Sequence, residues 1–109
     1  MESEVAELEV EIAMLPSAGQ RRSNYRPENK HPLTGDFLIG EITFKQGLAD
    51  PGVPAAALVR ILALPSNLAS LIEFGSWTIW EGPTHVGSVK LTGLGPNNSF
   101  KPKPLRGSA

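Results

Sequence analysis

Residues 7–14 read Glu-Leu-Glu-Val-Glu-Ile-Ala-Met, and this stretch decides the fold. Apolar residues stand at every second position, and a period of two with β-branched side chains is typical of a half-buried strand. A helix is the alternative, because glutamate and alanine are good helix formers, but the strict alternation favours a strand. We expect the glutamates to form a solvated row on the outer side of this strand: Glu7, Glu9 and Glu11.

The following residues repeat short apolar segments between turn-forming residues. The chain has Gly 11 and Pro 10 in 109 residues, more turn chemistry than a helical bundle tolerates. Pro65 ends one apolar segment, and Ser66 suits the N-cap of a single helical turn over residues 66–71. Five or six short strands with a turn about every ten residues predict an all-β sandwich or barrel. We expect the further strands at residues 37–44, 57–64, 76–80 and 86–94.

The chain is the length of one domain, which we place at residues 1–94. Residues 16–30 are rich in Ser, Asn, Gly and Pro and predict a long loop. Residues 95–109 contain three prolines and three basic side chains with few apolar groups. We therefore expect residues 95–109 to form a flexible, basic, proline-rich tail.

Composition excludes several functional classes. The ten Lys+Arg and eleven Asp+Glu give a net charge of −1, so no strong basic field attracts nucleic acid. With no cysteine, the chain has no disulfide, thiol catalysis, iron–sulfur cluster or cysteine-ligated zinc. The acidic first fourteen residues do not resemble a secretory signal, and Pro54 and Arg60 interrupt the longest apolar run. We expect a cytoplasmic protein with no membrane partner.

Two stretches resemble a known module, the third (C-terminal) β-barrel domain of elongation factor Tu. The sequence Asn-Tyr-Arg-Pro at residues 24–27 is similar to its Tyr-Arg-Pro signature. Residues 77–87, Trp-Thr-Ile-Trp-Glu-Gly-Pro-Thr-His-Val-Gly, resemble its Phe-x-Ile-Arg-Glu-Gly-x-x-x-Val-Gly hairpin, with Pro51-Gly52 matching a turn between them. The resemblance covers roughly residues 7–94. It implies a single six-stranded antiparallel β-barrel and a role related to translation.

The chain departs from the family at three points. It contains no Gly-x-x-x-x-Gly-Lys-Ser/Thr motif, so we expect no nucleotide binding. Trp80 replaces the arginine that precedes Glu-Gly in the family hairpin. Residues 28–32, Glu-Asn-Lys-His-Pro, are polar and turn-like where the family has a strand. The resemblance therefore implies a stand-alone relative whose own function has to be argued from its residues.

The first group of candidate binding residues lies around the Tyr-Arg-Pro sequence. Arg21, Arg22 and Arg26 form the densest basic spot before the tail, and Tyr25 lies among them. The family's corresponding loop lies near the surface that meets tRNA, so an RNA backbone is one possible partner. The alternative for Arg26, which we favour, is a structural role in bonding loop carbonyls. For Arg21 and Arg22, phosphate binding and simple solvation remain open.

The second group lies on the hairpin. Trp77 and Trp80 are three residues apart, so in a strand they face opposite sides. We assign Trp77 to the core and Trp80 to the outside, where it is either a binding hot spot or covered by Lys or Arg side chains, or by the basic tail. Gly82 and His85, in and beside the turn, complete the candidate site.

These observations favour a non-enzymatic binding module for an unknown protein partner. RNA binding is the alternative, but affinity for RNA falls by about 0.9 log units per neutralised duplex phosphate for each log unit of salt. A nearly neutral chain with so few free basic groups would bind RNA weakly. An uncharacterised enzyme is the remote third hypothesis. His31 and His85 lack carboxylates at ligand spacing, so we expect no metal and no cofactor.

Overall fold

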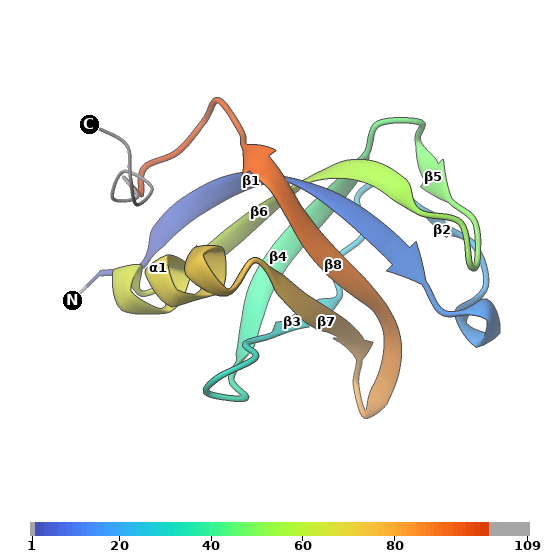
Figure 1. Ribbon diagram of the computed structural model, residues 1–109, viewed down its shortest axis with the longest axis horizontal. Coiled ribbons are helices and arrows are strands. Elements are labelled where there is room, and N and C mark those ends of the chain that lie inside the picture. The colour runs from blue at the N-terminus through green and yellow to red at the C-terminus, as the bar shows by residue number, and fades with distance from the viewer. Residues whose placement is uncertain (1, 101–109) are drawn as a thin grey trace.

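The structure is a computed structural model that describes residues 2–100. Six strands form a closed antiparallel barrel in the order β1-β6-β4-β3-β7-β8, and β2 pairs with β5 at one end (Figure 1). This confirms the predicted six-stranded barrel. The elements are β1 (Glu4–Met14), the 3-10 helix η1 (Pro16–Ala18), β2 (Arg21–Arg22), β3 (Glu28–Lys30), β4 (Phe37–Phe44), β5 (Leu48–Ala49), β6 (Ala55–Ala63), α1 (Pro65–Phe74), β7 (Ser76–Glu81) and β8 (Thr84–Leu94).

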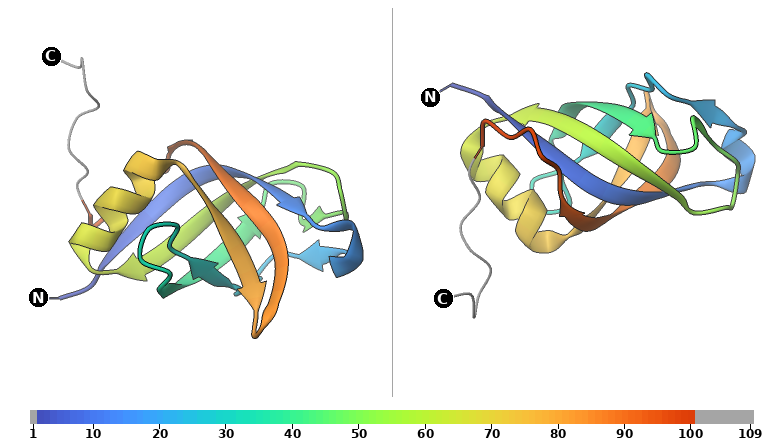
Figure 2. Two further views of the ribbon diagram at one scale, coloured as in Figure 1. Left: turned by 60° about the horizontal axis from the view of Figure 1, so that its bottom comes forward. Right: turned by 90° about the horizontal axis from the view of Figure 1, so that it is seen from above.

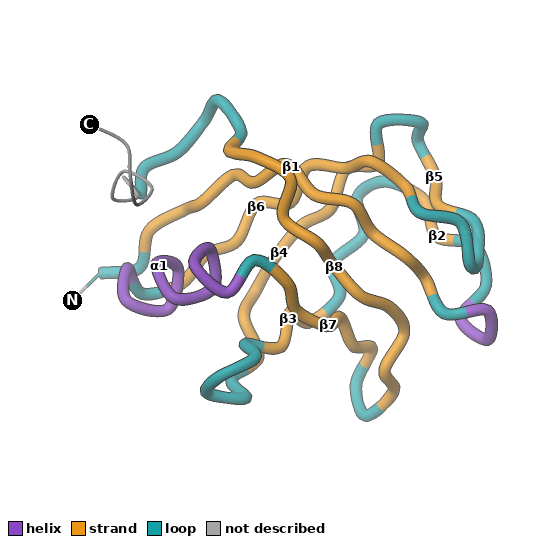
Figure 3. Tube along the Cα trace, viewed as in Figure 1, coloured by secondary structure: helices purple, strands orange, loops and turns teal. Residues whose placement is uncertain are grey.

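Strand β1 is the long central strand that its alternation predicts. The side chains of Leu8, Val10, Ile12 and Met14 point inward and are almost fully buried. On one side β1 pairs with β6, from Glu4 opposite Ala63 to Ile12 opposite Ala55. On its other side it pairs with β8. The sheet therefore closes around the apolar side of β1. Figure 3 shows that most of the trace is strand.

Strand β3 corrects the prediction of a loop over residues 16–30. Glu28–Lys30 pairs with both β4 and β7 and closes the barrel, although its sequence Glu-Asn-Lys is polar. The inward residue is Asn29, which is fully buried and accepts a hydrogen bond of 2.9 Å from Trp77 Nε1. Gly40 leaves the space that Asn29 fills, because a Cβ there would lie 2.5 Å from Asn29 Nδ2. A satisfied polar side chain thus completes the wall.

Helix α1 lies across one end of the barrel, opposite the β2–β5 end (Figure 2). It spans ten residues, longer than the single turn predicted, and it has no side-chain cap, so the N-cap assigned to Ser66 is wrong. Pro65 takes the first helical position, where its missing N–H costs nothing. Leu68 and Leu71 bury against the barrel core. Among residues 2–100 no helix is long and apolar enough to cross a membrane.

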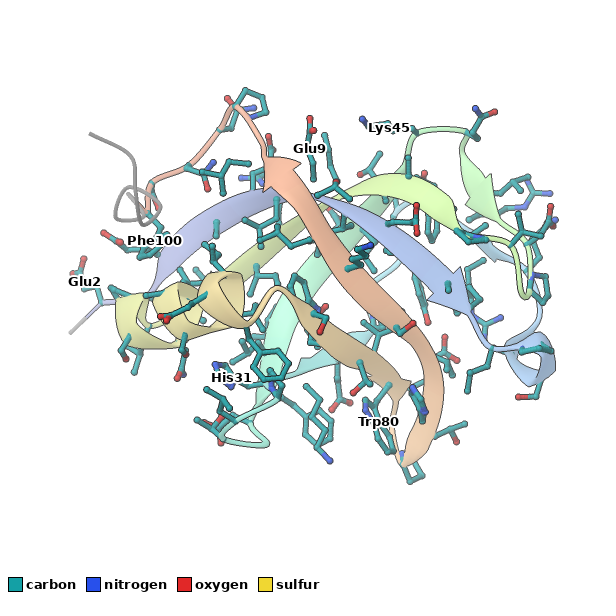
Figure 4. All side chains as sticks on the ribbon, viewed as in Figure 1. Glu2, Glu9, His31, Lys45, Trp80 and Phe100 are labelled. Carbon is teal, nitrogen blue, oxygen red and sulfur yellow. The ribbon has the colours of Figure 1, made fainter. Side chains whose placement is uncertain are left out.

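The segment after β8 folds back on the first half of β1. Gly95 N donates to Glu7 O at 2.8 Å, and Ser99 N and Phe100 N both donate to Val5 O. The side chain of Asn98 accepts from Glu7 N at 2.7 Å and donates to Glu7 O and Gly95 O. Figure 4 shows Phe100 close to the start of the chain. These contacts occupy the β1 edge that β8 leaves unpaired.

Two predictions are corrected by this packing. Residues 95–100 are part of the fold rather than a flexible tail, because they supply partners to β1; residues 101–109 lie outside the described residues. Glu7 is buried rather than solvated, while Glu9 is half-buried and Glu11 is exposed. The Glu7 carboxylate accepts a hydrogen bond from Asn97 N at 3.3 Å and lies 4.0 Å from Arg60 Nε. The returning segment covers one member of the glutamate row.

The Asn98→Ala variant is expected to lower the free energy of unfolding by about 2 kcal/mol, because it removes partners from two backbone groups of Glu7. Asn97→Ala is the matched control, since only its backbone N–H is used in the contact with Glu7. It should cost less than about 0.5 kcal/mol. Chemical denaturation of both variants checks this. Equal stability of Asn98→Ala and wild type would mean that residues 95–100 do not contribute to the fold.

Candidate binding site

Aromatic side chains from three strands and one lysine gather on the outer face of the barrel. This group comprises Trp80 from β7, Phe37 from β4, His85 from β8 and Lys30 from β3, and is called the aromatic patch below. Trp80 and His85 stack with ring centroids 5.3 Å apart, and Phe37 meets Trp80 edge-on at 6.3 Å. Lys30 Nζ lies 4.9 Å from the centre of the Trp80 ring. Figure 4 shows Trp80 beside the β7–β8 hairpin.

Strand alternation and one β-bulge build this patch. Trp77 is 3% exposed in the core, so Trp80 points to the outside and is half-buried, as predicted. The β7–β8 register shifts between Ile79 and Trp80, which places Trp80 opposite His85 and leaves Val86 as an extra residue. A bulge re-aims the side chains around it. Here it brings the His85 ring onto the face of Trp80.

The rings of the patch are held by polar contacts. Trp80 Nε1 donates to Thr78 Oγ1 at 2.9 Å, and His85 Nε2 donates to Gly87 O at the same distance. The turn that precedes His85 is the predicted hairpin turn, with Gly82 at a positive φ of 59° and Glu81 opposite Thr84. Glycine at the first central position suits a type II′ turn. The aromatic patch is therefore a preorganised surface.

A hollow of about 860 Å³ adjoins the aromatic patch on the outer face of β1, β8 and β7. Its floor is low because the strand register aligns small side chains there: Ala13 lies opposite Ser88, and Ser88 lies opposite Thr78. Trp80 and Phe74 stand at its border, and Lys90 also lines it. A mostly apolar hollow bordered by aromatic rings, with a few polar side chains, is typical of a surface that accepts a ligand or a protein segment.

Tyr25 and Arg21 form a separate cluster with Glu81 of the hairpin. Glu81 accepts two hydrogen bonds from the Arg21 guanidinium, at 2.8 and 2.9 Å, and a third from the Tyr25 hydroxyl at 2.5 Å. The hydrogen bonds from Arg21 lower the pKa of the Glu81 carboxyl, and the same pairing raises the pKa of Arg21. Burial, together with the hydrogen bond to Glu81, raises the pKa of the Tyr25 hydroxyl.

The remaining basic candidates differ in how they are used. Arg26 pairs with the Glu41 carboxylate at 2.9 Å, so its structural partner is a carboxylate and not the loop carbonyls that we expected. Arg22 is exposed. Of the three arginines considered for phosphate binding, Arg21 and Arg26 already have carboxylate partners. Glu81 joins the two groups of candidates, because it contacts Arg21 and Tyr25 and neighbours both Trp80 and Gly82.

Sequence reasoning missed Lys30 and Phe37. Lys30 lies in a segment that the sequence predicts to be a loop, and only the pairing of β3 with β7 places it beside Trp80. Phe37 was expected in a strand, but nothing in the sequence paired it with residue 80. The Lys30 side chain lies over the Trp80 ring, which agrees with the predicted alternative in which a lysine or arginine covers Trp80. The aromatic patch therefore depends on a barrel closure that local sequence does not reveal.

Tyr25 is expected to remain protonated at pH ~10, where a free tyrosine is half ionised. Because folding raises its pKa, the stabilisation is complete below pH ~10 and is lost as the pH rises toward the folded-state value. The chain has a single tyrosine, so the ultraviolet absorbance of tyrosinate reports this group alone. Glu81→Gln should move the ionisation to lower pH. Ionisation of wild-type Tyr25 at pH ~10 would contradict the arrangement.

A close serine–histidine pair lies at the junction of α1 and the β3–β4 loop. The buried His31 has Nε2 at 2.7 Å from Ser70 Oγ, while Nδ1 accepts from Leu33 N at 3.1 Å and Thr34 N at 3.3 Å. The two backbone donors place the proton on Nε2, which therefore donates to Ser70 and cannot take its proton. The Ser70 hydroxyl itself donates to Ser66 O. The pair fastens the loop to the helix and lacks the geometry of a nucleophile and its base.

No protein-family model and no curated protein matches the chain. The resemblance to the third domain of elongation factor Tu therefore stays a prediction from residues 24–27 and 77–87.

Proposed function

We propose that the chain is a non-enzymatic binding module that recognises a protein segment through the aromatic patch and the adjoining hollow. The observation that carries the proposal is the stacked, outward-facing Trp80 at the border of the hollow. Tryptophan is enriched at binding hot spots because its large rigid ring gains contact area with little loss of freedom. The patch is fixed by hydrogen bonds before any partner arrives, which lowers the ordering cost of binding.

The charges near the patch favour a particular chemistry in the partner. Lys30 Nζ lies over Trp80 and makes no ion pair among residues 2–100, nor does the exposed Lys90 in the hollow. A segment that places an apolar side chain on Trp80 and a carboxylate near Lys30 matches both features. Such a contact combines apolar burial with a charge-assisted hydrogen bond.

RNA binding is the alternative function. The cytoplasmic location and a role related to translation also remain predictions. The arginines that would contact phosphates support RNA binding poorly, because Arg21 and Arg26 are paired with Glu81 and Glu41. Arg22 stays available. With a net charge of −1, the chain also lacks a field that would compensate at physiological salt.

Trp80→Ala is expected to weaken partner binding about 30-fold or more while costing about 1 kcal/mol or less in stability. The test captures partners from native cytoplasm with the full chain, with and without nuclease, and quantifies recovery. Leu94→Ala, which alters an exposed apolar residue outside the patch, is the control and should not change recovery. Recovery that nuclease abolishes would favour RNA instead. Nuclease-resistant recovery unchanged by Trp80→Ala would remove the patch from the proposal.

A further inference from the structure

A second exposed apolar surface lies on the barrel face formed by β1, β6 and β4, which run side by side in the right view of Figure 2. Val5, Leu62 and Ile39 lie opposite one another in one row across the three strands. Ile39 is 72% exposed and Leu62 is 45% exposed, values that are unusual for neighbouring aliphatic side chains at mid-sheet. Neighbouring exposed apolar side chains of this kind mark interaction surfaces.

The next row on this face alternates in charge. The strand register aligns Glu7, Arg60 and Glu41, and Arg26 extends the row through its ion pair with Glu41. Residues 95–98 cover Glu7, so the accessible charges across the face are positive, negative and positive, from Arg60, Glu41 and Arg26. A half-turn about the midpoint between Arg60 and Glu41 places each of these two side chains opposite the other. A pattern of this kind matches its own copy after a half-turn.

We propose that this face, called the β1–β6–β4 face, binds a second copy of the chain around a two-fold axis parallel to the strands. Such an axis reverses each row but keeps apolar rows opposite apolar rows. Leu62 then meets Ile39 of the other copy, and Arg60 meets its Glu41. An isologous contact requires a self-complementary surface, and the central pairs Leu62–Ile39 and Arg60–Glu41 satisfy this requirement.

The face also has a place for the protruding side chain. A hollow of about 200 Å³ lies among Ile39, Glu41, Arg60 and Leu62. The half-turn brings Ile39 of the other copy toward this hollow. A knob that fills a depression on the opposite copy supplies the packing that an interface core needs.

The charge row allows a decisive test by sedimentation of the full chain over a range of concentrations. Arg60→Glu and Glu41→Arg, each alone, oppose like charges across the axis and should weaken self-association about tenfold or more. An equimolar mixture of the two variants opposes unlike charges at both positions and should restore the dimer as a heterodimer. If the dimer forms in the mixture but with neither variant alone, misfolding of a variant cannot explain the loss of self-association.

A second pair of variants keeps the test valid if a charge reversal disturbs the fold. Ile39→Glu should weaken self-association about 30-fold or more, since it places a charge in the apolar row. Val53→Glu, at a residue 56% exposed outside this face, should leave it unchanged. Trp80→Ala should also leave it unchanged, which separates this proposal from the proposed function. A wild-type chain that stays monomeric, or a dimer insensitive to Ile39→Glu, would overturn the proposal.

Discussion

Replacing Trp77 by alanine is expected to lower the free energy of unfolding by about 3–5 kcal/mol, the largest effect of any single substitution considered. The indole is buried in the barrel core, and its Nε1 donates to Asn29 Oδ1 at 2.9 Å. The variant therefore leaves a cavity and also removes the partner of a fully buried amide. Since Asn29 is the inward residue of β3, the loss also weakens the strand that closes the barrel.

Denaturant titration of Trp77→Ala beside Trp80→Ala measures the difference directly. Trp80 is half-buried on the outer face, so Trp80→Ala should lower the free energy of unfolding by about 1 kcal/mol or less. Asn29→Ala should destabilise by about 2 kcal/mol, because it leaves the indole N–H without its acceptor. If Trp80→Ala proved the more damaging of the two tryptophan variants, the assigned inner and outer sides of β7 would be wrong.

Gly87→Ala is expected to cost about 2–3 kcal/mol, because a Cβ at this position has no room. It would lie 2.8 Å from the backbone oxygen of Ala13 and 3.3 Å from Ile79 Cδ1. The first contact is with backbone, so relief requires β1 and β8 to separate. Gly87 also borders the bulge that sets His85 beside Trp80. The variant should therefore weaken partner binding as well as stability.

Gly93→Ala on the same strand is the matched control for Gly87→Ala. The nearest atom to a Cβ there is Glu9 Oε1 at 3.4 Å, the end of a flexible side chain. Thermal melting should show a loss below about 1 kcal/mol for Gly93→Ala. A Gly87→Ala protein as stable as this control would show that the β1–β8 contact has more freedom than the structure indicates.

The strands that could be predicted from the sequence are those with a local period. The alternation from Leu8 to Met14 and the turn at Gly82 each carry their own signal, and both are confirmed. Strand β3 carries none, because the partner that makes Asn29 acceptable inside the barrel is Trp77, 48 residues away. The same holds for Glu7, whose burial depends on residues 95–98.

The candidate site likewise combines a residue with a local sequence signal and residues whose contacts depend on distant parts of the chain. The outward position of Trp80 follows from the spacing of two tryptophans in one strand, which local sequence provides. Its neighbours Phe37 and Lys30 come from other strands, so their contacts required the barrel order. The sequence predicts a structural role for Arg26 and leaves the role of Arg21 open, but it cannot identify their partners Glu41 and Glu81, because Glu41 and Glu81 are distant in sequence from the arginines. Composition gives the number of charges but not their pairing.

The most direct test of the binding-module account uses the two tryptophans as separate fluorescent probes. Trp77→Phe leaves Trp80 as the only tryptophan, and Trp80→Phe leaves Trp77. Acrylamide should quench Trp80 readily in the free protein and poorly once the partner recovered by capture is added, whereas Trp77 should be protected in both states. Quenching of Trp80 that the bound partner does not change would contradict the account.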